Sequence, residues 1–191
     1  MKKNQLVSIA AIAIVLLVSF TSCSKNDPVP ELDQEEYNSV QLTFEHGTYA
    51  NNVFTPSDEE TVINFTKNGT PTPAAINLTE GESYRMKINI LQDDESINQE
   101  IIDEADEHQF FFLGSPEGVF DYKYEDDQVG LTGILSALKQ TSAPFDFQIL
   151  LRHALNKDHT AAQSWNNAQY VEAGGADDLN IKLKIQVLST N

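Results

Sequence analysis

The chain contains few basic residues and almost no cysteine. Its 191 residues include one Cys, and 12 Lys and Arg stand against 29 Asp and Glu, which gives a formal net charge of −17. A single Cys excludes a disulfide framework. The shortage of basic side chains excludes a nucleic-acid-binding protein, because phosphate contacts require clustered Lys and Arg. It also argues against docking to an anionic membrane through a basic patch.

The chain also lacks an apolar run long enough to span a bilayer. The longest run, from Leu6 to Phe20, follows Lys2 and Lys3. As a helix it would extend about 22 Å, which is short of the roughly 30 Å hydrocarbon core of a membrane. A short basic segment followed by an apolar run of this length is typical of a secretory signal peptide. We therefore predict that residues 1–22 are a signal peptide.

The only cysteine lies at the end of this predicted signal. Thr21, Ser22 and Cys23 resemble the lipobox of bacterial lipoproteins, with Phe20 at the position that usually holds Leu. The resemblance implies cleavage before Cys23 and acylation of Cys23, and two or more acyl chains anchor a protein stably in a membrane. The alternative is an ordinary secretory signal that contains a Cys.

Residues 23–36 contain two prolines and several acids and almost nothing that could be buried. This composition predicts a flexible, lipid-anchored tether. The segment that begins at Lys25 resembles the signal that directs lipoproteins of Bacteroidota to the cell surface, and a solvated linker is the alternative. We expect a lipid-anchored protein of the outer membrane that is exposed at the cell surface or faces the periplasm.

The remaining chain, residues 37–191, is dominated by alternation of apolar and polar residues. Such alternation places one apolar row on one face of a β-strand. The clearest runs are Val40–Phe44, Tyr84–Ile90, Phe145–Leu151 and Leu179–Val187, with shorter runs at Thr61–Phe65, Phe110–Leu113 and Val119–Tyr124. They predict a mainly β, single-domain antiparallel β-sandwich of about seven strands.

Three segments depart from this alternation. Ile97, Ile101 and Ile102 have helical spacing, so we predict one short acidic helix over residues 96–107. Residues 134–139 are a second candidate for a helical turn. Residues 156–175 are predicted to be a long loop, and loops of that length are often functional.

No catalytic motif is apparent. The sequence contains no nucleophile elbow, no metalloprotease helix and no phosphate-binding loop. Its adjacent acidic pairs point to opposite faces of a strand, so none is a convergent dyad. We therefore predict that the protein is not an enzyme. The acidic segment 121–128 lacks the order of a calcium-binding EF-hand loop, although loop carboxylates from several turns could still gather around Ca²⁺.

Histidine supplies the main candidate for a binding site. His108 follows the predicted helix, and His153 continues the inward-facing parity of residues 145–151. If the ends of these segments coincide, His108 and His153 with Glu104 or Glu107 would form a nitrogen and oxygen site suited to a divalent metal such as Zn²⁺ or Cu²⁺. Two His side chains could alternatively bind a haem iron. Ordinary structural roles for both His residues are the competing interpretation.

Aromatic residues in the long loop offer a different function. Trp165 and Tyr170 could stack on a glycan if their rings are exposed. A single Trp more often fills a hydrophobic core.

Four segments together resemble a family of small surface or periplasmic lipoproteins of Bacteroidota. The segments are Tyr37–Glu45 (YNSVQLTFE), Ile97–Phe112 (INQEIIDEADEHQFFF), Leu150–His153 (LLRH) and Gly174–Val187 (GGADDLNIKLKIQV). The resemblance implies an immunoglobulin-like sandwich and an association with TonB-dependent receptors of the outer membrane. It also implies a role in the capture and handover of a scarce nutrient, with a metal, haem or another small ligand as the candidate.

These observations lead to one principal hypothesis and two alternatives. The principal hypothesis is a non-enzymatic, membrane-anchored ligand-binding or accessory component of outer-membrane metal or haem uptake. The alternatives are a surface adhesion or glycan-binding module that uses Trp165 and Tyr170, and a structural protein-interaction domain.

Overall fold

The computed structural model describes residues 36–190. The chain divides into two units, residues 1–31 and 32–191, and every described residue belongs to the second. The predicted signal peptide (1–22), Cys23 and all of the predicted tether except residue 36 lie outside the described residues. Within residues 36–190, no helix has the length and apolar character needed to cross a membrane.

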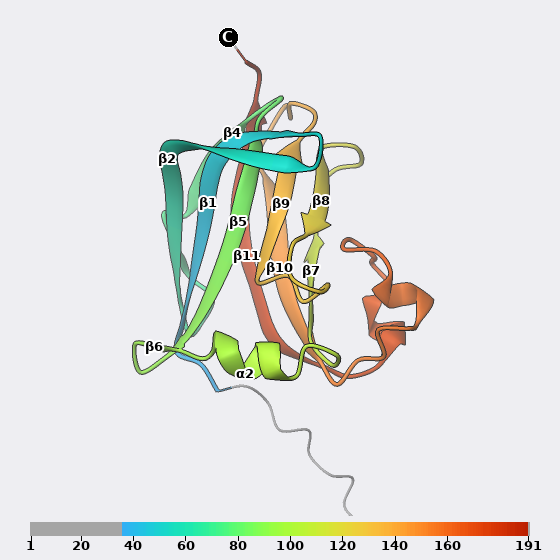
Figure 1. Cartoon of the computed structure of the whole chain (residues 1–191). Helices are drawn as coiled ribbons and strands as arrows, with labels where there is room; N and C mark the ends of the chain where they lie inside the picture. Colours follow the sequence, from blue (N-terminus) through green and yellow to red (C-terminus); the bar gives the residue numbers. More distant parts are fainter. Residues whose placement is uncertain (1–35, 191) are drawn as a thin grey trace, which may run out of the picture. The chain divides into compact units, whose positions relative to one another are not determined.

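The domain is built from two β-sheets that face each other (Figure 1). The first sheet has the strand order β3-β2-β1-β5-β9-β8, with β6 paired to β5, and the second has the order β4-β11-β10-β7. In chain order the strands are β1 (Ser39–Ala50), β2 (Val53–Thr66), β3 (Pro71–Thr72), β4 (Ala75–Thr79), β5 (Ser83–Gln92), β6 (Glu95–Ser96), β7 (Gln109–Leu113), β8 (Phe120–Tyr124), β9 (Thr132–Ala137), β10 (Phe145–His153) and β11 (Ala176–Leu188). The mainly β sandwich predicted from the alternation is confirmed. The strands outnumber the seven expected, and β4 pairs with β11 in parallel.

The core lies between the two sheets and follows the alternation seen in the sequence. Five residues of β11 are buried at every second position, from Leu179 to Val187, and the intervening residues are mostly exposed. Strand β10 contributes Phe147, Ile149 and Leu151 to the same core. One apolar row per strand therefore supplies most of the core between the sheets.

A short helix, α2 (Asn98–Asp103), lies across one end of the sandwich (Figure 1). Ile97 and Ile101 are buried in the core between the sheets. The helix is shorter than the predicted range 96–107, because Ser96 belongs to β6 and the last helical residue is Asp103, which is followed by the C-cap residue Glu104. The helix closes this end of the core and positions the residues that follow it.

The helical turn considered at residues 134–139 is wrong, because these residues belong mainly to strand β9. A short apolar run has no clear periodicity and does not distinguish a helix from a buried strand. Here β9 pairs with both β5 and β8, and this backbone pairing determines its conformation.

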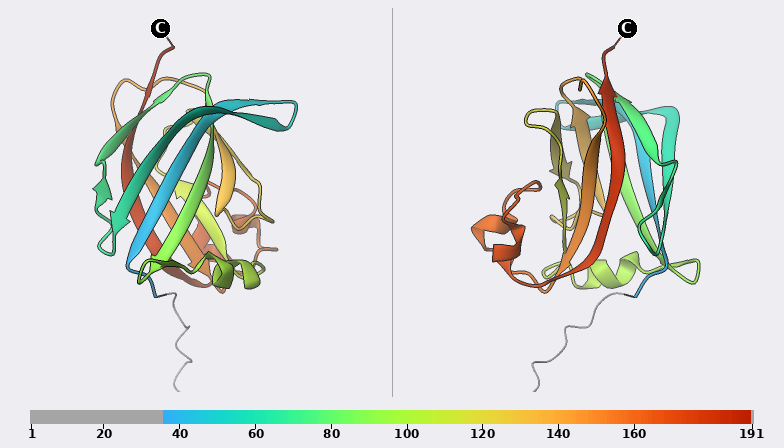
Figure 2. Two further views of the ribbon diagram at one scale, coloured as in Figure 1. Left: turned by 60° about the vertical axis from the view of Figure 1, so that its left-hand side comes forward. Right: turned by 180° about the vertical axis from the view of Figure 1, so that it is seen from behind.

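The long segment between β10 and β11 lies beside β7, outside the sandwich (Figure 2). It contains two 3₁₀ turns, η1 (Thr160–Ala162) and η2 (Tyr170–Ala173), and otherwise has the irregular backbone predicted for residues 156–175. Ala161, Ala162 and Ala173 pack with Phe111 and Leu150 in a second hydrophobic cluster. The segment therefore covers apolar side chains on the outer face of the second sheet.

Candidate metal centre

Two histidines lie side by side at the end of the second sheet that α2 closes. Strands β7 and β10 are antiparallel, with Gln109 opposite Arg152. His108, the residue before β7, therefore lies next to His153, the last residue of β10. Their rings are stacked, with centroids 4.4 Å apart and planes 16° from parallel. The His108 side chain is fully buried and that of His153 is 13% exposed. The pair is therefore reached from solvent through His153.

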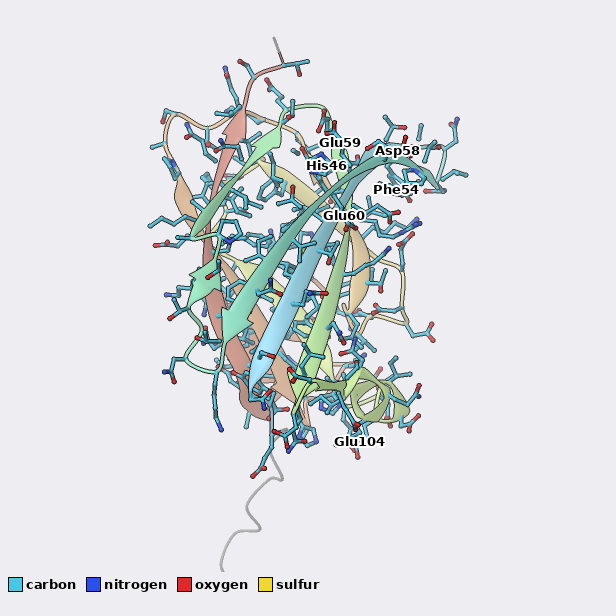
Figure 3. The ribbon with its side chains drawn as sticks, turned by 90° about the vertical axis from the view of Figure 1, so that its left-hand side faces the viewer. His46, Phe54, Asp58, Glu59, Glu60 and Glu104 are labelled. Carbon is cyan, nitrogen blue, oxygen red and sulfur yellow. The ribbon has the colours of Figure 1, made fainter. Side chains whose placement is uncertain are left out.

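Glu104, at the C-terminal end of α2, lies over one side of this pair. Its backbone carbonyl is 3.2 Å from His108 Nδ1. Its carboxylate oxygen Oε2 is 4.0 Å from His108 Nδ1 and 3.8 Å from His153 Nε2. The Glu104 side chain is 57% exposed, and Figure 3 shows it at the end of the domain opposite to His46. Glu104, His108 and His153 together form a group of donor atoms close enough to hold a metal ion.

A second carboxylate, from Asp178 on β11, lies on the inner side of the histidine pair. Asp178 Oδ2 is 3.7 Å from both His108 Nε2 and His153 Nδ1. A β-bulge places it there, because Leu151 pairs with Leu179 and Arg152 pairs with Asp177. One strand thus has an extra residue at Asp178, which turns this side chain inward.

Three polar atoms of this inner side, both Asp178 carboxylate oxygens and His153 Nδ1, are buried. The Asp178 side chain is 1% exposed. Within residues 36–190, neither Asp178 oxygen nor His153 Nδ1 has a hydrogen-bond partner. A buried carboxylate without a hydrogen bond is costly, and a bound ion is one of the few explanations for such a group in a native protein. Burial, together with the negative charge of Asp178, also raises the pKa of Tyr37.

Two imidazole groups and two carboxylates suit a divalent transition-metal ion such as Zn²⁺ or Cu²⁺. Metal–ligand bonds of 2.0–2.1 Å in a tetrahedral site place the donor atoms about 3.3 Å apart. The 3.7 Å separations on the Asp178 side are therefore a few tenths of an ångström too wide. The stacked rings would also have to change their orientation, because imidazole lone pairs lie in the ring planes.

The remaining histidines and the second candidate carboxylate lie apart from this site. Glu107 is exposed and is not part of the donor group. The Nε2 atom of His46 lies 3.0 Å from the hydroxyl oxygen of Thr61. His159 accepts a hydrogen bond from the backbone N–H of Ala161 at the start of η1.

The aromatic residues considered for glycan stacking are partly buried. Trp165 packs against the main core, with its ring 6.0 Å from that of Tyr122. Tyr170 packs against Phe111 and lies under the Arg152 guanidinium. Both rings already contact protein on one face, which is the packing role that a lone Trp usually has.

Two carboxylates of the acidic segment considered for calcium, those of Glu125 and Asp126, already accept hydrogen bonds from protein donors. The Asp126 carboxylate accepts backbone hydrogen bonds from Gly130 and Thr132, both 2.8 Å long. Burial raises the pKa of Asp126, and these hydrogen bonds oppose the increase. Glu125 forms a bidentate ion pair with Arg85. These carboxylates stabilise a turn and a strand pair.

Comparison of the chain with family models, with curated proteins and with solved structures gave no match. The site must therefore be interpreted from its own geometry and chemistry.

Proposed function

We propose that the protein is a non-enzymatic, lipid-anchored metal-binding protein that captures a divalent transition-metal ion at the His108–His153 pair. The supporting observation is the convergence of two histidines and two carboxylates at one end of the sheet, with one carboxylate buried and without a hydrogen-bond partner within residues 36–190. Histidine and carboxylate donors bind Zn²⁺ and Cu²⁺ well. The partly exposed Glu104 and His153 provide the route from solvent.

The geometry favours a small ion over haem. Axial His ligands of a haem lie on opposite faces of the macrocycle. His108 and His153 are stacked directly on one another, with ring centroids 4.4 Å apart. A porphyrin could enter only if the strands that carry the rings separated.

The cellular location and partners are part of the same proposal and rest on the sequence. The signal-like segment and Cys23 support lipid anchoring in the outer membrane, at the cell surface or facing the periplasm. The family resemblance supports delivery of the ion to a TonB-dependent receptor. The net charge of −17 would help to attract cations to the domain.

Isothermal titration calorimetry of the full chain in detergent, with Zn²⁺ and Cu²⁺, tests the proposal. We expect one ion to bind per chain. The substitution His153→Asn should weaken binding by more than the roughly 10–100-fold typical for loss of an outer-shell partner. His46→Asn is the matched control, because His46 lies at the other end of the domain (Figure 3). Absence of binding by the wild-type protein, or equal losses in the two variants, would reject the proposal.

A further inference from the structure

The two carboxylates next to the histidine pair are not equivalent. Glu104 lies on the exposed side, near His108 Nδ1 and His153 Nε2, and Asp178 lies on the buried side, near His108 Nε2 and His153 Nδ1. An ion bound to Glu104 would be coordinated by His108 Nδ1 and His153 Nε2, whereas an ion bound to Asp178 would be coordinated by His108 Nε2 and His153 Nδ1. The nitrogens available for coordination therefore decide which carboxylate is the ligand.

The tautomer of His108 favours the buried side. A carbonyl oxygen only accepts hydrogen bonds, so the 3.2 Å contact between His108 Nδ1 and the Glu104 carbonyl requires the proton to be on Nδ1. Neutral His108 then has its lone pair on Nε2, the nitrogen that faces Asp178. Metal-binding histidines commonly donate their other ring N–H to a backbone carbonyl in this way.

His153 has the matching arrangement. Its Nδ1 lies 3.7 Å from Asp178 Oδ2 and has no hydrogen-bond partner within residues 36–190. Its Nε2 lies 3.8 Å from the Glu104 carboxylate, which can accept the Nε2 proton once the ring turns. Glu104 thus faces the nitrogen of each histidine that lies away from Asp178. Its backbone carbonyl faces His108 Nδ1, and its carboxylate faces His153 Nε2.

We propose that Asp178, His108 Nε2 and His153 Nδ1 are the three protein ligands of the ion, and that Glu104 is a positioning residue that orients both rings. This inference rests on the proposed function and specifies its ligand set. Three protein ligands leave one position of a tetrahedral ion for water or for an exchanging ligand, as in open zinc sites. An open position suits a protein that releases its ion to a partner.

The ligand set makes a distinctive prediction for the substitution Asp178→Asn. In the metal-free protein the Asp178 carboxylate is buried without a hydrogen bond within residues 36–190. A neutral amide of the same shape is less costly to bury. Metal-free Asp178→Asn should therefore unfold at a higher urea concentration than the metal-free wild type, although it binds metal more weakly. If Asp178 only supported the fold, the substitution would lower the midpoint.

Metal affinity, measured by competition with a chromogenic Zn²⁺ chelator on the full chain, separates the two carboxylates. Asp178→Asn should weaken Zn²⁺ binding at least about 100-fold, above the range for outer-shell partners. Glu104→Gln keeps a carbonyl acceptor for His153 and should weaken binding less than about tenfold, below the range for complete loss of an outer-shell partner. Glu107→Gln is the matched charge control and should not change the affinity, because Glu107 is exposed and outside the donor group. A larger loss in Glu104→Gln than in Asp178→Asn would overturn the assignment and leave the proposed function intact.

A long-range ¹H–¹⁵N NMR spectrum of the histidine rings gives a direct second measurement. Zn²⁺ should shift the nitrogen resonances of His108 Nε2 and His153 Nδ1 and leave protons on His108 Nδ1 and His153 Nε2. The opposite pattern, with His108 Nδ1 and His153 Nε2 bound to metal, would show that Glu104 is the ligand and overturn the inference. Failure of the wild-type protein to bind any Zn²⁺ or Cu²⁺ would instead reject the proposed function itself.

Discussion

Arg152 and Asp177 form an ion pair between β10 and β11, directly beside the bulge that turns Asp178 inward. The same guanidinium donates hydrogen bonds of 2.8 Å to the carbonyls of Gly174 and Gly175. The Arg152 side chain is 9% exposed. Three acceptors at the start of β11 are thus held by one buried side chain, and this interaction fixes the position of the bulge.

Loss of this guanidinium should destabilise the domain and weaken the site. We expect Arg152→Met to lower the free energy of unfolding by about 2–4 kcal/mol, because buried acceptors lose a charged partner. Zn²⁺ affinity should fall as well, since the bulge that holds Asp178 loosens. Urea unfolding and a Zn²⁺ titration measure the two effects.

Lys184→Met is the matched control for this prediction. Lys184 pairs with Asp146, and both side chains are 58% exposed. Exposed ion pairs contribute about 0–1 kcal/mol. An Arg152→Met effect no larger than that of Lys184→Met would contradict the role given to Arg152.

Two neighbouring glycines, Gly174 and Gly175, differ in how closely they pack against the backbone of His153. Gly174 and Gly175 both have positive φ, at 87° and 75°. A Cβ at Gly174 would meet no atom within 4 Å, whereas a Cβ at Gly175 would overlap the His153 carbonyl oxygen. Gly174 has φ 87° and ψ −166°, a backbone region adopted almost only by glycine, so we expect Gly174→Ala to cost about 1–3 kcal/mol through backbone strain alone. Gly175→Ala should cost more and also weaken Zn²⁺ binding, as measured by urea unfolding and metal titration. Equal effects of the two substitutions would contradict this prediction.

Stability should fall at alkaline pH because tyrosines are buried. Burial, together with the hydrogen bond to Glu82, raises the pKa of Tyr84 to about 12, although the Thr79 N–H opposes this increase. The raised pKa means that the unfolded chain loses the Tyr84 proton first, so the stabilisation is complete below pH 10 and is lost as the pH rises towards 12. The loss attributable to Tyr84 is about 1.4 kcal/mol per pH unit in this window.

The substitution Tyr84→Phe isolates this contribution. Between pH 10 and 12 the free energy of unfolding of the variant should fall less steeply with pH than that of the wild type. Other buried tyrosines, including Tyr122 and Tyr124, also have raised pKa values, so part of the slope will remain. At pH 8 the variant should be less stable by about 1 kcal/mol, because the Thr79 N–H loses its acceptor. Identical slopes in the two proteins would contradict the prediction.

We expect lipid anchoring to depend on Cys23. The substitution Cys23→Ser should abolish incorporation of labelled palmitate and move the protein from the membrane fraction to the soluble fraction, because the thiol is the expected acylation site. Ser24→Ala, at the next position, is the control and should leave both results unchanged. Membrane association of Cys23→Ser without label would point to a different mode of attachment.

Much of the fold could be predicted because the alternation in the sequence corresponds to burial. The parity of residues 145–151 also predicted that His153 faces inward, and the strand register then places it opposite His108. The boundaries of α2 and the conformation of residues 134–139 could not be predicted, since backbone pairing with distant strands determines them.

Asp178 could not be found from the same alternation. Its neighbours Leu179 and Ile181 face the core, so strict alternation with period 2 gives residue 178 the orientation of exposed Asn180. The bulge reverses this orientation, and its position depends on the pairing of β11 with β10. The adjacent glycines 174 and 175 were the only local signal of an irregular backbone before this strand.

The ligands of the proposed centre are widely spaced along the chain, and Asp178 lies on β11, the last strand within residues 36–190. His108 and His153 precede β11, but Asp178 reaches its place only when β11 pairs with β10. A nascent or clipped chain that ends before residue 176 would carry both imidazoles without the inner carboxylate. Only chains that include β11 would then retain the metal tightly. Bound metal would therefore distinguish these chains from truncated ones.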